Sequence, residues 1–238
     1  MSLKRHIPNA ITCCNLLSGC FSILFVLTGR PVAAALAIFA AGIFDFFDGF
    51  AARLLNVHSP IGADLDSLSD VVSSGVAPGF IMYSLMCQAA HPQLWLASFD
   101  VLPFAAFLLP VCSALRLARF NIDDTQKTSF RGIPAPGMAC FVASLPLALN
   151  QTGHLNDGSL GFWICFGIVI VFSILMVCNL RFFSFKMKSA KWKGNELRWT
   201  FLVLALIGLA VFRWMALPFV MVLYILLSVV FMNKIEGD

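Results

Sequence analysis

The chain has 238 residues, of which 60% are hydrophobic and only 12% charged, with a formal net charge of +4. Soluble domains carry roughly 25% charged and about 45–50% apolar residues, so a water-soluble fold of this composition would expose large apolar surfaces. The composition therefore excludes an ordinary soluble protein and leaves no room for a separate soluble domain of usual size.

Eight apolar stretches approach the roughly 20 residues that a helix needs to cross a bilayer. They cover residues 8–28, 31–53, 65–88, 100–119, 133–151, 159–180, 198–212 and 214–232. Their continuous apolar character lacks the two-residue alternation of a membrane barrel. The sequence thus predicts an all-α, polytopic transmembrane helix bundle. The last two stretches are short, and Arg213 with Pro218 marks the expected turn between them.

Positive charge divides unevenly between the predicted loops. If both termini are cytoplasmic, all of the 16 Lys and Arg residues except Arg30 and Arg213 lie on the cytoplasmic side. This asymmetry follows the positive-inside rule and predicts an even number of spans. The basic segment 186–198 is interpreted as a topology determinant, with contact to anionic lipid headgroups as the alternative. It is not typical of a nucleic-acid-binding module.

Acidic side chains concentrate in one window of the sequence. Five of the 12 Asp and Glu residues fall between positions 45 and 70, at the predicted cytoplasmic ends of the second and third spans. Asp45 and Asp48 are three residues apart, and Asp66 and Asp70 are four apart, so each pair shares one face of a helix. The turn between the spans brings the two faces together. Intramembrane carboxylates are energetically unfavourable and therefore indicate function.

Four carboxylates at close range do not all stay ionised unless cations lie among them. Hard oxygen ligands favour Mg²⁺, Mn²⁺ or Ca²⁺, and two such ions would leave positions for phosphate oxygens, as in two-metal phosphoryl transfer. Gly49 and Ala52 leave space for a flat base or ribose, and Arg53 supplies a cation for a phosphate. Taken singly, the glycine is also typical of helix packing and the arginine of membrane anchoring.

These residues form the pattern Asp45-x2-Asp48-Gly49-x2-Ala52-Arg53-x8-Gly62-x3-Asp66-x3-Asp70. The pattern resembles, at every position, the signature of the CDP-alcohol phosphatidyltransferase family. The resemblance implies a six-helix core over residues 1–180, followed by a basic cytoplasmic loop and two additional helices over residues 181–238. It implies a multi-pass enzyme of a bacterial or archaeal-type cell membrane with a cytoplasmic site, and it favours a homodimer.

The same resemblance implies roles for individual residues. The metal ligands would be Asp45, Asp48, Asp66 and Asp70, holding Mg²⁺ or Mn²⁺ as a pair of ions. Asp70 would also be the general base that removes the proton of the attacking hydroxyl. The CDP moiety would contact Asp48, Gly49, Ala52, Arg53, Gly62 and Asp66.

Four segments indicate the acceptor alcohol. Residues 7–15, 69–79, 116–121 and 130–136 resemble blocks of the family branch that transfers a phosphatidyl group from CDP-diacylglycerol to L-serine, releasing CMP. Serine needs donors for its carboxylate and acceptors for its ammonium group. Candidates for binding the acceptor or a phosphate are Asn9, Asn15, Ser73, Arg116, Arg119, Asn121 and Arg131. Membrane anchoring for the arginines, helix capping for the asparagines and interhelical hydrogen bonding for the serine are the alternatives.

Other activities remain open at this point. Glycerol 3-phosphate and inositol phosphate are alternative acceptors, although glycerol 3-phosphate enzymes usually carry an arginine where Asn15 stands. A cation or proton transporter also uses intramembrane carboxylates. Transporters usually place them near the bilayer midplane and contain internal repeats. Here the acids gather at one membrane face, and the Asp pattern does not recur in the second half of the chain.

Overall fold

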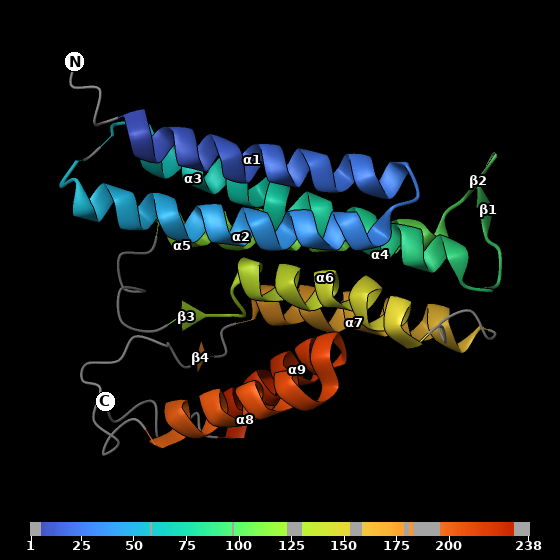
Figure 1. The fold of residues 1–238 in the computed structure, drawn as a ribbon. Helices are drawn as coiled ribbons and strands as arrows, with labels where there is room; N and C mark the ends of the chain where they lie inside the picture. The colour runs from blue at the N-terminus through green and yellow to red at the C-terminus, as the bar shows by residue number, and fades with distance from the viewer. Residues whose placement is uncertain are drawn as a thin grey trace.

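The computed structural model describes residues 6–57, 59–96, 98–122, 130–152, 159–178, 181–182 and 196–230. Within these ranges the fold is a bundle of helices that run alternately in opposite directions (Figure 1). The helices are α1 (His6–Leu27), α2 (Pro31–Leu54), α3 (Gly62–Val71), α4 (Ala77–Gln88), α5 (Leu108–Ile122), α6 (Ala135–Thr152), α7 (Leu160–Val177), α8 (Glu196–Phe212) and α9 (Ala216–Val230). Most of the basic segment predicted at 186–198 lies outside the described residues.

Six helical stretches of the described chain are long and apolar enough to cross a membrane. They are His6–Leu27, Pro31–Leu54, Gly62–Gln88, Leu102–Ile122, Leu160–Val177 and Phe201–Leu227, and Ala135–Asn150 is a shorter apolar helix. The chain is therefore an integral, multi-pass membrane protein, and the predicted all-α bundle is confirmed. Because α8 and α9 are shorter than a full span, separate crossings for 198–212 and 214–232 stay a prediction.

Two short irregular segments join the C-terminal and the central helices. A 3₁₀ turn at Arg213–Met215, where Arg213 has a φ of 54°, reverses the chain so that α9 packs back along α8 (Figure 1). The expected turn near Arg213 is thus observed. A π-helical turn at Val72–Val76 joins α3 to α4, so that Gly62–Gln88 forms one continuous rod.

Small residues let the central helices approach closely. Ala34 and Ala35 of α2 are fully buried, and the Ser22 hydroxyl of α1 donates a buried 2.9 Å hydrogen bond to the Ala34 carbonyl. A cluster of buried apolar side chains from α2, α4, α5, α6 and α7 forms the core, including Ile38, Met82, Leu109, Val142 and Phe162. This packing holds α2 and the α3–α4 rod rigidly beside α1, which positions the acidic end of the bundle.

Two pairs of two-residue strands close the ends of the bundle. β1 (Trp95–Leu96) pairs antiparallel with β2 (Phe99–Asp100), at the end where α4 finishes. β3 (Phe130–Arg131) pairs antiparallel with β4 (Arg181–Phe182), at the opposite end, near the beginning of α6 (Figure 1). The β3–β4 contact continues into a hydrogen bond of 3.0 Å from the Ile133 amide to the Leu175 carbonyl.

Gly132, which follows β3, is expected to tolerate no side chain. Its φ is +75°, and a Cβ atom there would lie 2.5 Å from the Met176 carbonyl oxygen. Gly132→Ala combines a left-handed backbone with a clash against main chain, and we expect it to destabilise the folded protein by about 2–4 kcal/mol. Thermal unfolding in detergent measures this difference. Gly167→Ala is the control, because no atom of the described part of the chain lies within 4 Å of its Cβ position. Equal unfolding temperatures for the two variants would contradict the argument.

Candidate active site

The end of α2 and the beginning of α3 carry the acidic residues, and the loop between them sets their relative position. Gly62 is the first residue of α3, and a Cβ there would lie 3.2 Å from the Ser59 Cβ. Asn9 of α1 donates a 3.0 Å hydrogen bond to the Ser59 hydroxyl. Of the predicted site residues, Asn9 and Gly62 therefore fix the loop through which α3 starts.

Three of the four predicted metal ligands converge. Carboxylate oxygens of Asp45, Asp48 and Asp66 all lie within 4.8 Å of one another. Asp48 Oδ2 and Asp66 Oδ1 are buried and have no hydrogen-bond partner among the described residues. Buried acceptors of this kind are nearly always satisfied, and several carboxylates at this range repel one another unless a cation lies between them. The donor set is therefore one that a hard divalent cation fits.

Asp70 lies beside this group and has a different environment. It follows Asp66 by one helical turn and lies within electrostatic range of Asp45. Its carboxylate is buried, and Oδ1 accepts a 3.1 Å hydrogen bond from the Asn15 side-chain amide of α1. Arg116 of α5 lies within electrostatic range of it. The surroundings hold Asp70 in one orientation at the edge of the acidic group.

The side of α2 next to Asp48 is open. Among the described residues, no atom lies within 4 Å of the Cβ position of Gly49, and Ala52 is half-buried. Arg53 is exposed and lies along the helix, where its Nε donates a 3.0 Å hydrogen bond to the Gly49 carbonyl. A flat group can therefore approach the α2 backbone at Gly49 without displacing a side chain.

Exposed aromatic side chains flank the open face of α2. Phe46, Phe47 and Phe50 are each 46–63% exposed, and the rings of Phe46 and Phe50 stack with centroids 6.4 Å apart. Asp45 and Asp48 alternate with them along the same helix. Carboxylates and exposed aromatic rings thus occupy adjacent faces of a single helix, so the acidic group lies at the edge of an exposed apolar surface.

The predicted acceptor residues separate into two sets. Asn15 and Arg116 are buried beside Asp70. Arg119 is exposed and donates a 3.1 Å hydrogen bond to the Val177 carbonyl at the end of α7, and exposed Asn121 donates a 2.9 Å bond to the Ser67 hydroxyl of α3. These two residues make contacts between helices.

The remaining acceptor candidates lie in the packing elements. Ser73 is buried in the π-helical turn, where the Cβ position of Gly19 lies 2.8 Å from its Cα. Arg131 belongs to β3, and its backbone pairs with Arg181.

Sequence reasoning missed two polar residues near the site. Thr12 lies one turn before Asn15 on α1 and its hydroxyl is beside Asp48, while also donating a 3.0 Å hydrogen bond to the Pro8 carbonyl. Ser113 lies one turn before Arg116 on α5 and is fully buried. The signal was their three-residue spacing from Asn15 and Arg116, which places each pair on one helix face.

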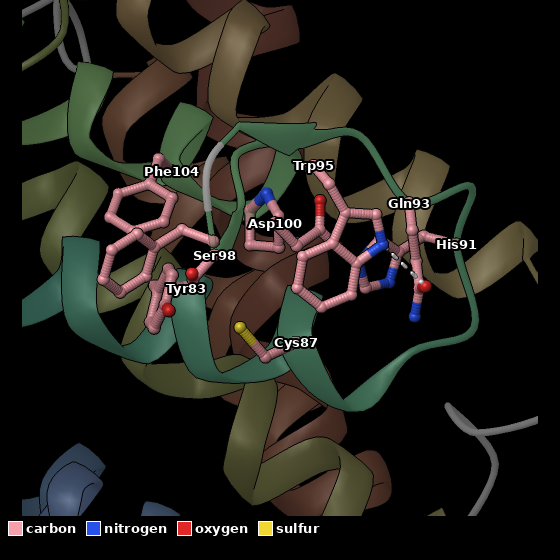
Figure 2. A pocket seen from close by; sticks show the side chains of 10 residues that line it. Tyr83, Cys87, His91, Gln93, Trp95, Ser98, Asp100 and Phe104 are labelled. Carbon is pink, nitrogen blue, oxygen red and sulfur yellow. Dashed lines mark hydrogen bonds and ion pairs between the residues drawn. The ribbon is translucent and has the colours of Figure 1, made fainter.

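A cavity with a volume of about 350 Å³ lies under the β1–β2 hairpin, at the far end of the bundle from the acidic group (Figures 1 and 2). Its walls include Tyr83, Cys87, Trp95 and Phe104. None of the predicted site residues lines it. The cavity is therefore separate from the candidate active site.

The hairpin over this cavity is stabilised by a part-buried contact between the His91 ring and the Asp100 carboxylate. His91 Nε2 lies 2.6 Å from Asp100 Oδ2, and Nδ1 lies 2.7 Å from the Ala89 carbonyl oxygen, so a ring protonated at both nitrogens donates to both. Desolvation raises the pKa of Asp100, but hydrogen bonds from His91 and from the Leu94 and Leu102 amides outweigh it and leave this pKa below its usual value.

A carboxylate whose pKa is lowered in the folded state stabilises that state at any pH above its ordinary pKa. This stabilisation is lost as the pH falls through the folded-state pKa. We therefore expect Asp100→Asn to lower the unfolding temperature at neutral pH. The difference from the unchanged chain should shrink as the pH drops below 3.8, the ordinary value for Asp. Unfolding scans of both proteins in detergent across this pH range test it. A difference in unfolding temperature that stays constant with pH would show that the charge of the Asp100 carboxylate does not contribute to stability.

The structure defines the class of protein, which is a membrane-embedded helix bundle with converging carboxylates. Comparison with known proteins identifies the family to which it belongs. The model of the family described as CDP-alcohol phosphatidyltransferase matches residues 5–175. This match covers more than half of the chain, and the chain belongs to the CDP-alcohol phosphatidyltransferase family.

Individual relatives carry more specific names. A CDP-diacylglycerol--serine O-phosphatidyltransferase of Mycobacterium leprae is 40% identical over 164 residues, which are 66% of this chain but only 50% of that protein. One of Helicobacter pylori is 33% identical over 227 residues, covering 94% of this chain and 89% of the relative. An archaetidylserine synthase of Methanothermobacter thermautotrophicus is 32% identical over 179 residues, covering 74% and 69%. The names of all three relatives include serine.

Proposed function

We propose that the protein transfers the phosphatidyl group of CDP-diacylglycerol to the hydroxyl of L-serine and releases CMP. The observation that carries this proposal is the group formed by Asp45, Asp48 and Asp66 beside the Asp70–Asn15 pair, in a member of this family. The names of relatives from bacteria and an archaeon support serine as the acceptor. Two of the three names support CDP-diacylglycerol as the donor.

The acidic group would hold divalent cations, which we propose to be a pair of Mg²⁺ or Mn²⁺ ions. The unpartnered oxygens of Asp48 and Asp66 support this assignment, with Asp45 and Asp70 completing the ligand set. Bound cations of this kind neutralise phosphate oxygens and stabilise the negative charge of the departing CMP. The carboxylates would place these cations at the edge of the acidic group, and so determine where an anionic diphosphate could bind.

Asp70 is suited to act as the general base. It lies outside the closest three-carboxylate group, and the Asn15 amide fixes one of its oxygens, which leaves the other to face the acceptor. As the serine oxygen attacks the β-phosphorus of CDP-diacylglycerol, its proton passes to Asp70. A new P–O bond to serine forms, the phosphoanhydride bond breaks, and CMP leaves with the electron pair of that bond.

The nucleotide would lie along α2. The open Cβ position of Gly49 and the half-buried Ala52 support an approach of the base or ribose to the helix, with Arg53 near the phosphates. Asp48 and Asp66 would contact the CDP moiety from the acidic side. Gly62 contributes through the loop that starts α3.

We further propose that the site faces the cytoplasm of a bacterial or archaeal-type cell, with both termini on that side. Arg53 at the end of α2 and Arg119 at the end of α5 lie at the same end of the bundle as the acidic group, which supports the positive-inside assignment. A homodimer is the expected assembly, and the mass of the detergent-solubilised particle checks it.

The proposed reaction is tested with purified protein in detergent or nanodiscs. CDP-diacylglycerol, Mg²⁺ or Mn²⁺ and L-serine are supplied, and CMP release and the lipid product are followed over time. Parallel reactions contain glycerol 3-phosphate, inositol phosphate or no acceptor. We expect CMP release to require serine. Faster release with another acceptor, or equal release without one, would overturn the proposal.

A further inference from the structure

Buried polar atoms without partners gather on the helices around Asp70. Among the described residues, Asn15 Oδ1, Ser113 Oγ and Arg116 Nε are buried and make no hydrogen bond. Asn15 and Ser113 are 0% exposed and Arg116 is 8% exposed. Buried polar groups are rarely left unpaired in native proteins, and an unpaired one costs free energy. Two donors and one acceptor in this position therefore point to a ligand that supplies the complementary groups.

The orientation of Asn15 follows from its partner. Asp70 Oδ1 is an acceptor when the carboxylate is ionised, so the atom of Asn15 that lies 3.1 Å away is the amide nitrogen. The carbonyl oxygen, Oδ1, is bonded to the same carbon and so lies within a few ångströms of Asp70. It presents an unpaired acceptor next to the base, where a cationic donor from a substrate would be satisfied.

Arg116 differs from an ordinary membrane anchor. Its guanidinium group is buried, it lies within electrostatic range of Asp70, and its Nε–H group has no partner in the described part of the chain. Arg119, one turn further along α5, is exposed and donates to the Val177 carbonyl. Ser113, one turn before Arg116, touches the π-helical turn, because a Cβ at Gly75 would lie 3.2 Å from the Ser113 hydroxyl oxygen.

We propose that Asn15 and Arg116 determine acceptor specificity by binding the two charged groups of an α-amino acid. The ammonium group donates to Asn15 Oδ1, and the carboxylate accepts from Arg116, with the Ser113 hydroxyl as a second donor. The hydroxyl of the acceptor then lies at Asp70. An acceptor phosphate would instead bring oxygens against the Asn15 carbonyl. This inference rests on the proposed function and assigns the groups that select its acceptor.

The test pairs two variants with two acceptor analogues, using the full chain in nanodiscs. Ethanolamine lacks the carboxylate of serine, and 3-hydroxypropionate lacks the ammonium group. Arg116→Gln should raise the KM for serine by about 10- to 100-fold and leave the KM for ethanolamine and for CDP-diacylglycerol unchanged. Asn15→Leu should lower kcat for both serine and 3-hydroxypropionate, because Asp70 loses its partner. It should raise the KM for serine and for ethanolamine, which carry the ammonium group, and leave the KM for 3-hydroxypropionate unchanged.

Controls separate specificity from folding and from the reaction itself. Arg119 lies on the same helix but is exposed, so Arg119→Gln should keep the wild-type preference for serine over ethanolamine. Arg116→Lys keeps the charge, so its KM for serine should lie between those of the wild-type protein and Arg116→Gln. An Arg116→Gln variant that raises the KM for CDP-diacylglycerol, or that keeps its preference for serine over ethanolamine, would overturn the proposal. Failure of the proposed function would be seen separately, because the unchanged protein would then release no CMP with serine.

Discussion

Asp70→Asn is expected to lower turnover by about 10²–10⁴-fold while the protein remains folded. The substitution removes the group that accepts the hydroxyl proton, but an amide oxygen at the same place still accepts from Asn15, so the buried 3.1 Å contact is preserved. The KM values for serine and CDP-diacylglycerol should change much less than kcat, since a general base acts in the transition state. CMP release in saturating substrate, with thermal unfolding as the folding check, measures this effect.

Two outcomes would contradict the assignment of Asp70 as base. Near-normal kcat would show that another group accepts the proton. A loss of Mn²⁺ binding as large as that in a variant of Asp66 would show that Asp70 acts mainly as a ligand. We expect Asp70→Asn to lose less Mn²⁺ affinity than Asp66→Asn, because Asp70 lies outside the group of oxygens that are all within 4.8 Å of one another.

Asp66→Asn is expected to weaken divalent-cation binding by at least about 100-fold, beyond the loss typical of removing an outer-shell partner. Its Oδ1 is buried and has no hydrogen-bond partner in the part of the chain that the structure describes, and its carboxylate belongs to the close group with Asp45 and Asp48. Binding is measured directly by electron paramagnetic resonance of free Mn²⁺, in the absence of substrates. Turnover should fall with the loss of binding and should recover partly at high Mn²⁺ concentration.

Asp64→Asn is the matched control for this experiment. Asp64 lies two residues earlier in the first turn of α3, is exposed and is not part of the close carboxylate group. The control removes the same charge from the same helix, so a shared electrostatic effect would appear in both variants. Equal Mn²⁺ affinities for the two variants would sink the assignment of a metal site to this group.

The membrane-spanning helices and the position of the acidic site could be predicted because both depend on residues close together in the sequence. Continuous apolar runs define helices of membrane length, and the spacing of Asp45, Asp48 and Asp66 places their carboxylates on helix faces that a single short loop joins. A close approach of these side chains follows from the antiparallel turn alone. Periodicity and length therefore sufficed for the bundle and for the acidic group.

Contacts between distant segments could not be derived in this way. The hydrogen bond of Asn15 to Asp70 joins residues 55 positions apart, and the difference between buried Arg116 and exposed Arg119 depends on which face of α5 meets the π-helical turn. The π-helical turn itself shifts the face of the rod after Asp70, and an ideal helical periodicity does not predict it. The cavity under the β1–β2 hairpin was missed because two-residue strands leave almost no sequence pattern.

The aromatic face of α2 has a consequence for how the lipid donor reaches the enzyme. Phe46, Phe47 and Phe50 are exposed, so under the proposed function they would contact the acyl chains of the bilayer, while Asp45 and Asp48 on the same helix would face the reacting headgroup. A donor lipid can thus arrive, react and depart by lateral diffusion within one leaflet, with its tails always in hydrocarbon. Its mole fraction in the membrane, rather than its amount per volume of solution, then sets how fast the site is filled.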